Sequence, residues 1–206
     1  MKEKRWFPIV YMFVATAFFS SIVIAFAQVT NERVRANQAL ALEKSVLAVL
    51  PGISIEGLSS PQLHQKFVDE VSKPDASSGG AYTLGKGGDI KGYAVPIEGK
   101  GFWAMIKGVI GVEADRKTIT GIYFYEQNET PGLGAEIAKE DFRAQFKGKV
   151  ISGRDKTLNM KRPGAELGDS DVHAVTGATQ TSTRLEKIIN DGLKEWRSKM
   201  GASSAQ

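Results

Sequence analysis

The chain has 206 residues, of which 42% are hydrophobic and 24% charged, a composition typical of a folded protein with room for one domain and an attachment. The formal net charge is +4, and half of this charge lies before residue 30. The sequence has no stripe of basic residues of the kind that binds nucleic acid. The lack of cysteine excludes disulfides, thiolate catalysis and iron–sulfur ligation. With only two histidines, far apart in the chain, we expect no metal site.

The N-terminal segment predicts a membrane anchor. Phe7–Ala27 contains no charged residue, and as a helix its 21 residues would span about 31 Å, close to the hydrocarbon core of a bilayer. Basic residues at positions 2, 4 and 5 precede it, so the positive-inside rule places Met1 in the cytoplasm and residues after 30 on the extracytoplasmic side. A cleaved signal peptide is the alternative, since Ala25–Ala27 fits a cleavage pattern, but the apolar stretch is longer than usual for one.

The next segments predict a stalk and two short elements. Apolar residues recur at helical spacing over 30–50, and Pro51-Gly52 ends that pattern. We expect a second amphipathic helix over 61–72 and a loop over 73–80.

From Ala81 onward the pattern changes to strands. Alternation and β-branched residues predict strands at 92–97, 104–112, 119–125 and 148–152, with a hairpin turn at 115–117. A short helix is expected over 139–146. After residue 182, a C-terminal helix is predicted by apolar residues that fall on one face: Leu185, Ile188, Ile189, Leu193, Trp196 and Met200.

These elements together predict an α+β fold, in which a single N-terminal transmembrane helix is followed by an antiparallel-sheet domain with flanking helices. We divide the chain into a cytoplasmic tip and anchor (1–28), a stalk helix (29–52), the domain (53–200) and a flexible tail (201–206).

The segment Asp171–Ser182 carries the strongest functional signal. Hydroxyl-bearing residues gather around Gly177-Ala178, directly before the C-terminal helix. Loop N–H groups and the positive end of the helix dipole favour an anion there, and a threonine hydroxyl can hold a phosphate as an ester. An ordinary helix cap uses the same residue types and is the alternative.

Two further segments are of interest. Glu129–Gly134 places Pro-Gly after a strand, which indicates a turn that exposes backbone amides and turns Leu133 outward. Gly99–Trp103 sets a Phe-Trp pair between glycines and the following strand. Trp103 either stacks on an aromatic ring or fills the core, and burial statistics favour the core.

Taken together, Gly99–Trp103, Glu129–Gly134 and Thr176–Thr179 resemble the covalent-FMN subunits of membrane redox pumps, a family of FMN-binding domains. Its members include the covalent-FMN subunits of the sodium-pumping NADH:quinone oxidoreductase and of the Rnf complex. The order of the segments and the single N-terminal span also match. Gly99–Trp103 and the stretch Thr120–Glu126 before the Pro-Gly loop are more similar to the quinone-reductase subunit.

The resemblance implies FMN joined by a phosphoester to Thr179, with Thr181 as the nearby fallback. It further implies that Thr176, Gly177 and Ala178 line the phosphate and ribityl chain, that Glu129, Thr130, Gly132 and Leu133 pack on the flavin, and that Trp103 is its aromatic neighbour. One departure is His173, which stands where the family has Asp three residues before the motif. Asp171 lies two residues earlier.

The resemblance also implies an electron relay without catalytic residues of its own, in the inner membrane of a bacterium. Its expected partners are other membrane subunits of an ion-translocating NADH:quinone or ferredoxin:NAD oxidoreductase, including a second flavin subunit, a flavin transferase for maturation, and the lipid bilayer. The alternatives are a membrane-anchored structural or binding subunit without flavin, and a stand-alone extracytoplasmic flavoprotein that feeds another reductase.

Overall fold

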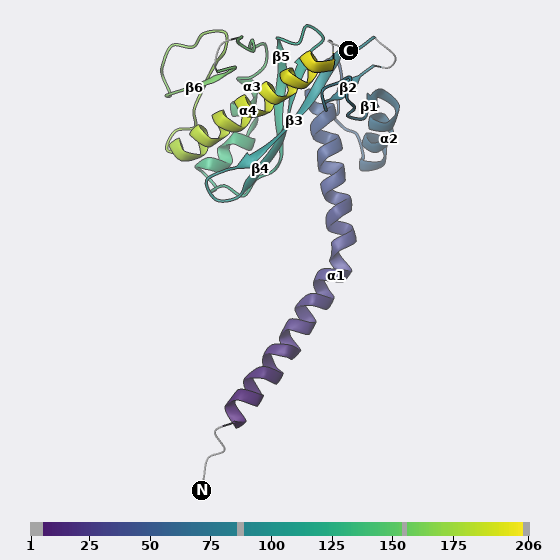
Figure 1. Ribbon diagram of the computed structural model, residues 1–206, viewed down its shortest axis with the longest axis vertical. Coiled ribbons are helices and arrows are strands. Elements are labelled where there is room, and N and C mark those ends of the chain that lie inside the picture. Colours follow the sequence, from purple (N-terminus) through teal and green to yellow (C-terminus); the bar gives the residue numbers. More distant parts are fainter. Residues whose placement is uncertain (1–5, 86–88, 154–155, 204–206) are drawn as a thin grey trace. The chain divides into compact units, whose positions relative to one another are not determined.

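The computed structural model describes residues 6–85, 89–153 and 156–203, which fall into two units, residues 1–39 and 40–206 (Figure 1). The basic residues at positions 2, 4 and 5 and the end of the expected tail, residues 204–206, lie outside the described residues. The topology and tail flexibility inferred from them therefore stay predictions.

The first unit is the N-terminal part of helix α1 (Phe7–Val49), which includes the whole predicted span Phe7–Ala27 and continues through the predicted stalk as far as Val49. An 18-residue window of it has a mean hydropathy of 2.3, so by length and composition it is apolar enough to cross a membrane. Two of its hydroxyl groups bond within the helix, since Ser21 and Thr30 donate to the carbonyls of Ala17 and Phe26 (2.7 and 2.9 Å).

The second unit begins with the last turns of α1, whose Val46, Leu47 and Val49 are buried. The helix ends before Pro51-Gly52, as predicted, and the Thr120 hydroxyl donates to the Val49 carbonyl near that end. Helix α2 (Ser60–Glu70) follows, but its predicted last two residues instead form strand β1. Pairing of Val71–Ser72 with the next strand outcompetes the final half-turn of helix.

The core of the second unit is a five-stranded antiparallel sheet in chain order. Its outer hairpin turns at Asp115, whose carboxylate accepts from the Lys117 and Thr118 amides (2.8 and 2.9 Å). Helix α4 (Thr179–Ser203) covers one face, while α2 and the end of α1 cover the other (Figure 1). The strands are β1 (Val71–Ser72), β2 (Tyr82–Leu84), β3 (Gly92–Lys100), β4 (Met105–Glu113) and β5 (Ile119–Glu126).

Three local features differ from what the sequence predicts. Residues 148–152 form a single bridge, Thr118↔Val150, because the chain turns sharply at Gly148 (φ +76°) and follows β5 only at its start. The helix expected over 139–146 is shorter, with a 3₁₀ turn (Gly134–Ala138) before α3 (Glu140–Ala144). A parallel pair of short strands, β6 (Asn159–Lys161) and β7 (Asp171–His173), was not predicted.

Helix α4 carries the predicted apolar face, and all six of its residues are buried. It begins at Thr179, four residues earlier than expected, and reaches Ser203. Two glycines allow it to lie close to β3, because a Cβ on Gly99 or Gly192 would lie within 2.7 Å of an isoleucine side chain across the interface. This packing fixes where the N-terminus of α4 meets the sheet.

Candidate functional site

The candidate site is built around the first turn of α4. Thr179 is its first residue, and the Ala178 carbonyl accepts the first helical hydrogen bond from the Ser182 amide (2.9 Å). Gly177 before it has φ +75°, a conformation that favours glycine. The first N–H groups of a helix have no partner within it and carry partial positive charge, so the exposed Thr179 hydroxyl lies where a phosphate is electrostatically favoured.

The two threonines that the sequence offers as attachment points differ in burial. Thr179 is exposed, whereas Thr181 is only 4% exposed and donates its hydroxyl to Glu129 Oε2 (2.7 Å). Thr181 also closes against Gly134, where a Cβ would lie 2.5 Å from its Oγ1. The geometry therefore favours Thr179 as the hydroxyl that another molecule can reach.

Glu129 lies beneath this surface rather than on it. Its side chain is 5% exposed, and its Oε1 accepts from the Trp103 backbone amide (3.1 Å) while Oε2 accepts from Thr181. Its carboxylate thus joins two segments that the sequence had singled out separately, the turn after β3 and the start of α4.

Above Glu129 lies an open apolar surface. Trp103 is 65% exposed, and its indole N–H donates to the Thr130 hydroxyl (3.0 Å), so the core alternative for Trp103 was wrong. Leu133 is 44% exposed and packs over Gly177, where a Cβ would lie 3.1 Å from Leu133 Cδ2. Gly132 provides the left-handed turn (φ +74°) that presents Leu133.

These contacts bring the three predicted segments together into one surface, which we call the shelf: residues 101–103, 129–134 and 176–179. Phe102, which was not among the predicted site residues, is part of it. It is half-exposed, with its ring centroid 5.0 Å from that of Trp103. Its signal in the sequence was the glycine that precedes the Phe-Trp pair.

The shelf is open rather than enclosed. Hollows of about 290, 410 and 480 Å³ occur elsewhere in the molecule, and none of the predicted site residues lines them. Among the residues described, no group of three or more His, Asp or Glu side chains is placed to hold a metal ion. The shelf thus suits a flat ligand held at one end by a bond or an anion site, with a ring lying on Trp103 and Leu133.

The residues before the shelf include Asp171 and His173. Asp171 is buried and accepts from Lys161 Nζ and the Gly168 amide (both 2.8 Å) and from Asn159 Nδ2 (3.1 Å). These donors, the Lys161 ammonium first, lower the pKa of Asp171 from 3.8 to about 2. Its carboxylate is therefore committed within the fold, whereas the His173 ring contacts the Ala165 carbonyl (Nε2–O 2.9 Å).

Comparison with known families shows what the part of the chain around the shelf is similar to. Residues 101–194 match the FMN-binding domain family, and this range contains every predicted site residue. The match spans a little under half of the chain. Its relatives include NqrC, a subunit of the Na(+)-translocating NADH-quinone reductase, from Vibrio anguillarum, 37% identical over 118 residues, and from Pasteurella multocida, 33% identical over 116 residues. The matches cover 56% and 55% of this chain but 46% and 43% of those relatives, about half of their length.

Solved structures confirm the predicted α+β fold. NqrC from Parabacteroides distasonis superposes with a TM-score of 0.64 at 24% identity, over 80% of this chain and 92% of that one. NqrC from Shewanella oneidensis superposes with a TM-score of 0.70 at 21% identity, over 83% of this chain and 100% of that one. The family match and the curated relatives confirm the predicted resemblance to the quinone-reductase subunit, and the matching family is one of FMN-binding domains.

Proposed function

We propose that this protein is a membrane-anchored electron-transfer subunit that carries FMN as a phosphoester of Thr179 and works within a sodium-translocating NADH:quinone reductase. The observation that carries the proposal is the exposed Thr179 hydroxyl at the start of α4, beside the apolar surface of Trp103 and Leu133, inside an FMN-binding domain. The relatives from Vibrio anguillarum and Pasteurella multocida are subunits of the Na(+)-translocating NADH-quinone reductase, which supports the choice of the quinone-reductase complex over the Rnf complex.

In this proposal each part of the shelf has one task. Thr179 holds the phosphate, whose charge is balanced by the N-terminal dipole of α4, with Thr176, Gly177 and Ala178 lining the phosphate and ribityl chain. Trp103, held by Thr130, and Leu133 offer apolar area to the ring system. Bound FMN supplies one-electron redox chemistry, and the covalent link keeps it from diffusing away.

Mutation of the two threonines tests the attachment. The full chain is coexpressed with a flavin transferase, and the denatured protein is examined by in-gel ultraviolet fluorescence. Thr179→Ala should abolish the fluorescent band, while Thr181→Ala and the exposed neighbour Thr176→Ala should retain it at least in part. Peptide mapping that finds FMN on Thr181 would contradict the proposal.

A parent chain without fluorescence in the presence of an active transferase would also contradict it, and would favour the structural subunit without flavin. His173→Asp separates the causes of such a failure, because it restores the acidic residue of the family motif. Copurification without any multi-span partner would instead favour a stand-alone flavoprotein.

We further propose that α1 anchors the chain in a bacterial inner membrane, with residues after 30 on the extracytoplasmic side, next to other subunits that include a second flavin subunit. The support is the apolar helix within α1 and the basic residues that precede it in the sequence. Protease added to right-side-out vesicles should degrade the domain. Protection there, with cleavage in inverted vesicles, would contradict this orientation.

A further inference from the structure

We infer that Glu129 is a positioning residue, which holds the flavin-contacting segments in register through its carboxylate and does not itself bind FMN. The inference rests on the proposed function for the identity of the ligand, but the contacts that carry it lie within the protein. It changes the role that the resemblance implied for Glu129, namely a contact of the loop with the flavin.

Both carboxylate oxygens of Glu129 already have partners. Oε1 accepts from the Trp103 amide at 3.1 Å and Oε2 from the Thr181 hydroxyl at 2.7 Å. These partners lie 26 residues before and 52 residues after Glu129 in the chain. A single side chain therefore connects the turn after β3, the loop after β5 and the first turn of α4.

The backbone of two glycines packs closely around the carboxylate. A Cβ on Gly101 would lie 2.5 Å from Glu129 Oε1, and a Cβ on Gly134 would lie 2.9 Å from Oε2. The two glycines thus let the backbone close around the carboxylate, and the whole side chain is buried. The Glu129 carboxylate acts on a shelf-bound ring only through the segments that it holds.

The chemistry of the three groups explains why an acidic side chain stands here. A carboxylate only accepts hydrogen bonds, and it faces one amide and one hydroxyl, both of which donate. Glutamine can reproduce this arrangement, because its oxygen accepts from Trp103 while its amide group donates to Thr181, whose hydroxyl also accepts. Alanine cannot, and it would leave two buried donors without partners.

The first test uses the chain without flavin. Full-length protein bearing Thr179→Ala is labelled with ¹⁵N-tryptophan in detergent micelles, and hydrogen exchange of the Trp103 amide is followed by NMR. Glu129→Ala should speed this exchange by about tenfold or more, whereas Glu129→Gln should leave it close to the parent value. Thr130→Val is the matched control, since it removes the bond to the Trp103 indole and leaves its amide bond intact.

The Trp196 amide in the same spectrum reports on the fold, because Trp196 lies on the apolar face of α4 and is buried in the core. If Glu129→Ala does not fold, the near-isosteric Thr181→Val replaces it and should also speed Trp103 exchange by removing one of the two anchors. Unchanged Trp103 exchange in a folded Glu129→Ala or Thr181→Val chain would overturn the inference.

The second test uses the flavin-loaded chain. Glu129→Ala should keep the covalent fluorescent band but change the fluorescence yield and anisotropy of the flavin, and Glu129→Gln should restore both. A flavin signal altered equally by Gln and Ala, with the Trp103 amide undisturbed, would make Glu129 a direct flavin ligand and overturn the inference. If the parent chain carries no flavin, the proposed function fails, while the amide exchange still decides the role of Glu129.

Discussion

Two regions beside the first half of α4 each contain a buried carboxylate, but they use it differently. In the segment with β6 and β7, the Asp171 carboxylate forms an ion pair with Lys161 and accepts hydrogen bonds from two neutral donors. In the shelf, the Glu129 carboxylate accepts hydrogen bonds from two neutral donors. The exposed side chains of Trp103 and Leu133 lie above it.

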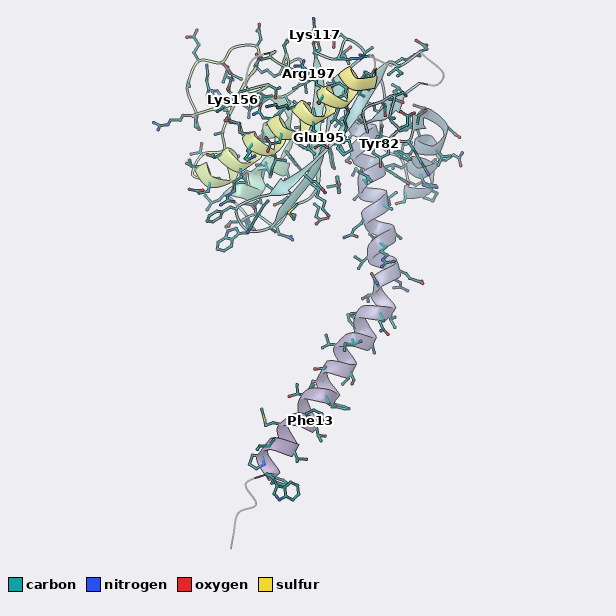
Figure 2. The ribbon with its side chains drawn as sticks, viewed as in Figure 1. Phe13, Tyr82, Lys117, Lys156, Glu195 and Arg197 are labelled. Carbon is teal, nitrogen blue, oxygen red and sulfur yellow. The ribbon has the colours of Figure 1, made fainter. Side chains whose placement is uncertain are left out.

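Residues 156–158, directly before β6, also contact α4. Asn190 accepts from the Thr157 and Leu158 amides (2.6 and 2.9 Å) and donates to the Leu158 carbonyl (2.8 Å). Lys156, labelled in Figure 2, pairs with Glu186 on the helix (2.6 Å). In the first region the polar groups hold the fold together. In the shelf they are buried below exposed apolar side chains, which are available to contact a ligand. Substitutions should therefore affect stability in the first region and the flavin in the second.

The largest effect on stability is expected from Asn190→Ala. It leaves three backbone groups of Thr157 and Leu158 without their partner, at a cost of about 3 kcal/mol in the free energy of unfolding. Urea unfolding of the full chain in detergent measures it, with Gln180→Ala on the exposed part of the same helix as the control. A change below about 0.5 kcal/mol would contradict the role of Asn190.

A smaller effect is expected from acid. The pKa of Asp171 is about 2 in the folded chain and 3.8 for the free side chain, so its stabilisation is fully present above pH 4 and is lost as the pH falls towards 2. Between pH 6 and pH 3 this loss amounts to about 1 kcal/mol. Asp171→Asn and Lys161→Met should each flatten this part of the pH dependence of unfolding. If the pH dependence of unfolding is unchanged in both variants, the acid sensitivity belongs to other groups.

The smallest effect on stability is expected from Trp103→Ala, within about 0.5 kcal/mol because the ring is mostly exposed. Its effect on the flavin should be large, with a changed fluorescence yield or midpoint potential and an intact covalent band. Redox titration of the loaded full chain measures the potential. An unchanged spectrum and potential would remove Trp103 from the flavin site and weaken the contrast between the two regions.

The predictions from sequence succeeded where the signal was local. The charge-free stretch of α1, the alternation in β3 to β5 and the apolar face of α4 each reflect a period within one element. The β6–β7 pair was missed because two three-residue strands carry no period, and their parallel pairing joins residues 12 apart in the chain. Likewise, the bridge at Val150 depends on where the chain passes β5.

For the site, the sequence by itself determined which three segments matter and which residue types they offer. The tertiary structure decided which of those residues are exposed and which are buried. Side chains two residues apart on a helix point in directions about 200° apart. Because α4 starts at Thr179 and packs its apolar face on the sheet, Thr179 faces outward and Thr181 inward. The roles of Glu129 and Trp103 depend in the same way on partners 26 and 52 residues away, whose positions only the packing of the whole domain sets.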